Sequence, residues 1–185
     1  MSELNPRAIP HIALTTDEIT ELRKLFDSEY LADHGQWNPE KPYGYSPADV
    51  HVVAFEGSRI IAHVGFQARL ISVGTADIVV AGTGGVLVDA EHRSTGLGSR
   101  VMAAAETAMR EDHRIRFGYL GCREEVVPFY ESTGWRRIRA VERATSRTDH
   151  AGIVTSDDSP LLICPVNARF SEWPQGEIDL HGTPW

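Results

Sequence analysis

The residues best suited to chemistry lie where a short apolar run meets a glycine-rich turn. Val86–Val88 has the composition of a buried strand end, and Gly96 and Gly98 stand where the next helical pattern begins. The first turn of a helix leaves backbone N–H groups without partners at the positive end of the helix dipole. Glycines let a ligand approach that backbone closely. The segment therefore favours binding of a diphosphate.

The spacing Arg93-x-x-Gly96-x-Gly98 matches neither the Rossmann nor the Walker phosphate loop. It resembles the acetyl-coenzyme A loop of the GNAT N-acetyltransferase superfamily, which has Gln or Arg followed by two small residues at this spacing. The resemblance implies that the preceding strand carries a bulge, for which Gly84 and Gly85 are suited. It implies that acetyl-coenzyme A contacts Val86, Leu87, Val88, Arg93, Ser94, Thr95, Gly96, Leu97, Gly98 and Ser99.

Beyond about residue 30 the chain resembles two narrower families. Arg59–Val64, the Gly85–Gly98 block, Val127–Trp135, Asp157-Asp158 before a closing strand, Glu172-Trp173 and a final Trp185 resemble the aminoglycoside 2'-N-acetyltransferases. Ile61–Gly65, Val73-Gly-x-x-Asp77, Gly96-Leu-Gly98 and Ser171–Gly176 resemble the nodulation-factor N-acyltransferases. Both families transfer an acyl group to an amine on a sugar.

The resemblance to GNAT enzymes assigns roles to individual residues. The Val86 N–H is expected to polarise the acetyl carbonyl as an oxyanion donor. Tyr130 is expected to protonate the departing thiolate, a transfer that is mildly uphill for an unperturbed phenol unless the site lowers its pKa. The aminoglycoside 2'-N-acetyltransferases have a glutamate just before the bulge. That position falls on Gly84 here, so the obvious base for the acceptor amine is missing.

Other groups are expected to hold the acceptor or to relay its proton. Asp158 and the carboxylate of Trp185 are assigned to both tasks. The expected substrate-binding set is Asp33, Trp37, Gly84, Asp158, Glu172, Trp173 and Trp185. With fewer carboxylates in the pocket, a less cationic compound such as kasugamycin fits better than an aminoglycoside with four or five amines.

Composition limits the partners. The 185 residues carry a net charge of −8 at pH 7, which disfavours nucleic acid and permits a small cationic amino sugar. No apolar run approaches the ~20 residues that a membrane helix needs. The N-terminus has no secretory pattern, and Cys122 and Cys164 are expected to be buried free thiols in the cytoplasm. No metal site is expected, and a homodimer is left open.

The remaining pattern predicts the scaffold. Thr15 and Glu18 form a capping box for a first helix, and a long Gly/Pro-rich loop follows over about 33–48. Strands are expected at 51–55, 59–67, 69–73, 77–88, 117–121, 135–144 and 161–166, with helices after Gly96 and over 126–132. These elements predict a single α/β (α+β) domain over 1–185 with the GNAT fold. Its mixed sheet has an antiparallel N-terminal meander and a parallel C-terminal crossover, flanked by helices.

Three functions fit this pattern. The first is acetyl transfer from acetyl-coenzyme A to an aminoglycoside amine, giving antibiotic resistance. The second is transfer of a fatty acyl group to a chito-oligosaccharide amine, which an acidic carrier docking on an acidic chain disfavours. The third is a non-catalytic sensor that binds acyl-coenzyme A, which the intact Arg93 loop and Tyr130 disfavour.

Overall fold

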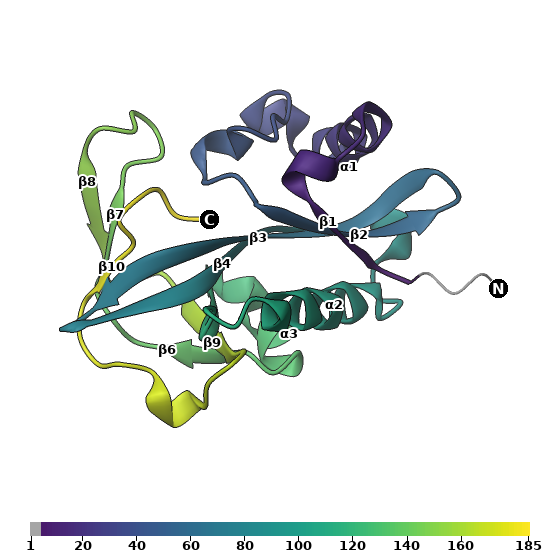
Figure 1. The fold of residues 1–185 in the computed structure, drawn as a ribbon. Coiled ribbons are helices and arrows are strands. Elements are labelled where there is room, and N and C mark those ends of the chain that lie inside the picture. Colours follow the sequence, from purple (N-terminus) through teal and green to yellow (C-terminus); the bar gives the residue numbers. More distant parts are fainter. Residues whose placement is uncertain (1–4) are drawn as a thin grey trace.

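The computed structural model describes residues 5–185 as a mixed sheet of ten strands with helices on both faces (Figure 1). The order across the sheet is β6-β9-β5-β4-β3-β10-β7-β8, while β2 pairs with β3 and carries β1 outside it. The strands are β1 Arg7–Pro10, β2 Val50–Glu56, β3 Arg59–Val73, β4 Ala76–Val88, β5 Phe117–Gly121, β6 Arg136–Ile138, β7 Glu142–Thr145, β8 Ile153–Ser156, β9 Leu161–Pro165 and β10 Ile178–Asp179. The helices are α1 Thr16–His34, α2 Leu97–Glu111 and α3 Val127–Ser132, with 3-10 turns at 11–13, 42–44, 90–92, 124–126 and 170–172.

The expected topology is confirmed. β2, β3 and β4 form an antiparallel meander, and β4 pairs parallel with β5 after the crossover through α2. In Figure 1, α1 covers one face of this sheet, and α2 and α3 cover the other. Within the described residues, none of the helices is both long and apolar enough to cross a bilayer.

Each long helix forms where its sequence places caps and apolar faces. Thr15 accepts from the backbone N–H of Glu18, and the Glu18 carboxylate accepts from the Thr15 N–H, which completes the predicted capping box of α1. This helix buries Leu22, Leu25 and Phe26. Gly96 begins α2 with a φ of +80°, in the left-handed region that favours glycine.

The sequence prediction differs from the structure where strands are interrupted or short. Residues 59–73 form one strand, and the expected strand over 135–144 is divided between β6 and β7. β6 pairs with β9 and β7 pairs with β10, so the chain crosses between distant parts of the sheet there. β1, β8 and β10 were not expected, because segments of two to four residues are defined by their pairing partners. Cys164 is buried, whereas Cys122 is only half-buried; both are free.

Candidate active site

A β-bulge lies in the middle of the sheet, where the glycine pair predicted it. The register between β3 and β4 jumps from Gly65–Gly84 to His63–Leu87. Two residues of β4, Gly85 and Val86, therefore stand opposite the single residue Val64 of β3. Gly85 has a φ of +60°, which explains why the bulge needs glycine at this point.

A cavity opens beside the bulge because β4 and β5 separate there. The two strands pair only from Val80–Phe117 to Gly82–Tyr119. Beyond that point a cavity of about 440 Å³ has Gly84–Val86 on one wall and Gly121–Arg123 with Tyr130 on another. Aromatic side chains from α1 and the loop after it complete the wall: Phe26, Tyr30, Trp37, Tyr43 and Tyr45.

Trp185 lies against β4 in the space that missing side chains leave. A Cβ on Gly82 would overlap the Trp185 indole, and one on Gly84 would lie 2.8 Å from the main-chain carbonyl carbon of Trp185. The Arg69 guanidinium stacks 4.0 Å from the centre of the indole ring, and the indole N–H donates to Gln67. Gly84, where the aminoglycoside family has its glutamate, therefore makes room for Trp185 at the edge of the cavity.

Tyr130 lines the cavity from α3, and only 8% of its surface is exposed. Burial is the main cause that raises the pKa of its hydroxyl, and Cys122 and Tyr30 add to the effect. An efficient proton transfer from Tyr130 to a thiolate would favour a lowered pKa. The site has the opposite effect. The phenol stays protonated and acts as a hydrogen-bond donor over the whole physiological range.

The phosphate-loop residues surround the N-terminus of α2, outside the cavity lining. A Cβ on Gly96 would have open space around it, so ligand atoms can approach the backbone there. Gly98 serves packing, because a Cβ would lie 3.1 Å from the Phe129 ring of α3. The Arg93 guanidinium donates to Glu29 over 2.6 Å, and the Thr95 hydroxyl donates to the His92 carbonyl. A diphosphate in this loop would compete with Glu29 for Arg93.

The structure does not bring the expected acidic residues together. Asp33 and Asp158 are exposed, and neither lines the cavity. Glu172 pairs with Arg116 over 2.6 Å and with Arg169 over 3.1 Å. Trp173 packs its ring edge-on to Phe117 in the core.

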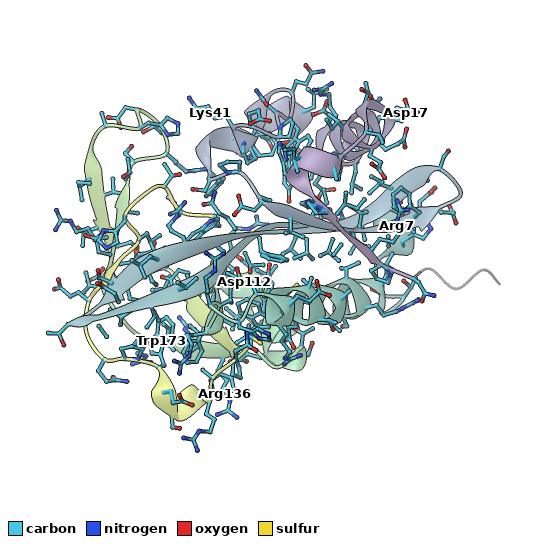
Figure 2. All side chains as sticks on the ribbon, in the orientation of Figure 1. Arg7, Asp17, Lys41, Asp112, Arg136 and Trp173 are labelled. Atoms are coloured by element: carbon cyan, nitrogen blue, oxygen red, sulfur yellow. The ribbon has the colours of Figure 1, made fainter. Side chains whose placement is uncertain are left out.

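Figure 2 shows Trp173 on the α3 side of the sheet, opposite the loop that carries Lys41. Of the acceptor groups expected from the sequence, Trp37, Gly84 and Trp185 do line the cavity. Trp37 stacks on Phe26 with 4.8 Å between ring centres. Aromatic side chains therefore stand where the sequence indicated the carboxylates of Asp33, Asp158 and Glu172, whereas the carboxyl group expected at Trp185 does lie beside Gly84 at the cavity.

Acidic side chains do not gather at the cavity, although the chain carries net negative charge. Among the described residues that line it, no side chain is Asp or Glu, and two, Arg123 and Arg147, are arginines. His51 and His63 also line it, and sequence reasoning missed them. The two histidines lie in apolar strands and are 12 positions apart in the sequence. Their contact follows only from the pairing of β2 with β3. No group of three or more His, Cys, Asp or Glu side chains within 5–185 could hold a metal ion.

Solved structures with the same fold include GNAT-family enzymes. The Escherichia coli GNAT family N-acetyltransferase YhbS, solved in complex with CoA, superposes with a TM-score of 0.61 at 14% identity, covering 98% of this chain and 92% of that one. Escherichia coli ElaA superposes with a TM-score of 0.60 at 15% identity, covering 86% and 98% of the two chains. At these identities the likeness establishes the GNAT fold.

Sequence comparison identifies the family. Nodulation protein A of Sinorhizobium terangae is 26% identical over 185 residues, which cover 91% of each chain. Nodulation protein A of Rhizobium leguminosarum bv. viciae is 26% identical over 159 residues, covering 75% of this chain and 73% of the relative. The family model for nodulation protein A (NodA) matches residues 10–183. With a GNAT fold and a match that spans nearly all of its length, the chain belongs to the NodA family.

Proposed function

We propose that this protein is an N-acyltransferase that moves an acyl group from a coenzyme A thioester to an amine of a chito-oligosaccharide. The observation that carries the proposal is the β4 bulge at Gly85 and Val86, placed where β4 and β5 separate beside the cavity. An acyl thioester lying along this part of β4 would have its carbonyl next to strand N–H groups that are released from regular pairing.

The cavity lining favours a chito-oligosaccharide over an aminoglycoside. An acceptor with several ammonium groups needs carboxylates around it, yet the described lining supplies Arg123 and Arg147 and no acidic side chain. Aromatic walls suit a neutral sugar chain that packs its ring faces on Tyr, Trp and Phe. Family membership points the same way, so we replace the aminoglycoside and resistance hypothesis with this one.

The local charge also answers the argument against an acidic carrier. Docking depends on the charge near the docking site, and the overall charge of −8 does not describe the mouth of the cavity. Arg123 and Arg147 are exposed and line the cavity, so an acidic acyl carrier is compatible with this site. The donor loop at Gly96 supplies the backbone N–H groups that a diphosphate needs.

In the proposed reaction the neutral amine attacks the thioester carbonyl. A C–N bond forms and the C–S bond breaks, while the amine loses a proton and the sulfur gains one. The Val86 N–H stabilises the negative charge that develops on the carbonyl oxygen. Tyr130 donates a hydrogen bond to the departing sulfur, because its buried phenol keeps its proton.

Thiol release from acetyl and long-chain acyl donors tests the proposal against a panel of acceptors. We expect release with a chito-oligosaccharide that has one free amine. The fully N-acetylated oligosaccharide, which differs only in lacking that amine, should give the background rate. Release with kasugamycin or another aminoglycoside alone would overturn the assignment of the acceptor. No release with any acceptor would overturn the enzyme assignment.

A further inference from the structure

A row of hydrogen-bonded side chains runs from the surface to the bulge. Glu40 contacts His11 over 2.9 Å, His11 contacts His51 over 3.0 Å, and His51 contacts His63 over 2.9 Å. The Nδ1 atom of His63 then contacts the carbonyl oxygen of Gly85 over 2.7 Å. Glu40 is largely exposed, whereas only 3% of His63 is exposed.

The inner end of this row defines where the ring protons lie. A carbonyl oxygen only accepts, so His63 must carry its proton on Nδ1 and donate to Gly85. In a neutral ring the other nitrogen then accepts, so His51 donates from Nδ1 to His63, and His11 donates from Nδ1 to His51. Burial supports the neutral form, since it lowers the pKa of His63 to about 4 and is the main cause that lowers that of His51 to about 3.

The Gly85 carbonyl and the Val86 N–H belong to one peptide unit. A peptide unit is planar and trans, so the direction of its C=O determines the opposite direction of its N–H. His63 therefore holds the N–H that lies in the bulge and faces away from the His63 ring. A hydrogen bond to the carbonyl also polarises the N–H of the same unit.

We propose that His63 is a positioning residue, which orients the Gly85–Val86 peptide so that its N–H points at the acyl carbonyl. The proton that His51 donates to Nε2 of His63, itself fixed by the one that His11 donates to His51, keeps His63 in the tautomer that this task requires. The inference rests on the proposed function. It also separates His63 from the role of general base, because both of its ring nitrogens are already engaged, one by Gly85 and the other by His51.

The packing around His63 leaves the ring little freedom to turn. The ring meets Phe26 edge-on with 5.2 Å between centres. A Cβ on Gly85 would lie 3.2 Å from both the Cε1 and Nδ1 atoms of His63. The bulge glycine and the histidine therefore form a matched pair: glycine at 85 gives the ring room to reach the carbonyl.

Two substitutions at one position separate the two hydrogen bonds of His63. The amide of Asn occupies the place of Nδ1, so His63→Asn keeps a donor for Gly85 and loses the bond to His51. The amide of Gln reaches the place of Nε2, so His63→Gln keeps the bond to His51 and loses the one to Gly85. Because each variant gives up one buried hydrogen bond, both should lose similar stability. His181→Asn, an exposed histidine outside the cavity lining, is the control.

Two readouts are measured on each folded variant: acyl transfer and the ¹⁵N chemical shift of the Val86 amide. For His63→Gln we expect kcat to fall about 100-fold with the acceptor KM little changed, as for the loss of an oxyanion donor. For His63→Asn we expect kcat within about fivefold of the natural protein, since the donor to Gly85 remains. The Val86 amide resonance should move in His63→Gln and stay in place in His63→Asn and His181→Asn.

Equal losses in the Asn and Gln variants, or an unmoved Val86 resonance in His63→Gln, would overturn the positioning role. If the natural protein transfers no acyl group, the proposed function fails, and with it the catalytic meaning of the peptide. The amide resonance still decides then whether His63 holds that peptide.

Discussion

Lowering the pH from 7 to 5 should weaken the fold through His51 and His63. In the folded protein their pKa values lie at about 3 and about 4, chiefly because of burial. In the unfolded chain both rings titrate near the ordinary value of about 6.5. The unfolded state therefore binds more protons at pH 5, so the free energy of unfolding decreases as the pH falls. Each ring contributes about 2 kcal/mol over this interval, and the pair about 4 kcal/mol.

Urea denaturation at pH 7, 6 and 5 measures this effect, with the double variant His51→Gln, His63→Gln as the reference. Asp89 raises the pKa of His92, and burial raises that of Glu142; both stabilise the fold as the pH falls, but equally in the two proteins. The double variant should be less stable at pH 7 and should lose about 4 kcal/mol less on going to pH 5. Parallel pH profiles for the two proteins would refute the conclusion that both rings are held neutral.

Three further predictions concern the donor loop, the leaving group and the acceptor wall. Gly96→Asp should weaken coenzyme A binding in calorimetry by more than about tenfold. Gly96→Asn, which tolerates the same φ without the charge, should weaken it far less. Equal coenzyme A affinities of the two variants would remove the diphosphate from this loop. Tyr130→Phe should lower kcat about tenfold with donor affinity unchanged, and an unchanged kcat would make Tyr130 a packing residue. Gly82→Ala displaces the Trp185 indole and should raise the acceptor KM. Gly152→Ala, outside the cavity lining and with 3.7 Å from its Cβ to the nearest atom, should leave the acceptor KM unchanged. Equal effects would place Trp185 outside the acceptor site.

The fold could be predicted because its signals are local. The capping box at Thr15, the glycine at the start of α2 and the glycine pair at the bulge each prescribe backbone conformation within a few residues. β10 could not be predicted in this way, because two residues become a strand only by lying between β3 and β7.

Part of the cavity lining could be predicted from the sequence, while the roles of its residues stay predictions. The bulge and Tyr130 follow from spacing along one segment, and both border the cavity. The histidine row could not be foreseen, since it joins residues that are 40 and 12 positions apart and appears only when β2 and β3 pair. The role expected for Glu172 has no support in its position, because a carboxylate at the right place in the sequence can still be used by nearby arginines.

Mass spectrometry of the acceptor after incubation with an acyl thioester tests the central claim most directly. A chito-oligosaccharide with one free amine should gain the mass of one acyl group, and fragmentation should place it on the sugar that carried the amine. The fully N-acetylated oligosaccharide should be recovered unchanged. An acyl group on a hydroxyl of both oligosaccharides, or transfer to an aminoglycoside while the chito-oligosaccharide stays unmodified, would contradict the claim that the cavity beside the β4 bulge presents a chito-oligosaccharide amine to the thioester.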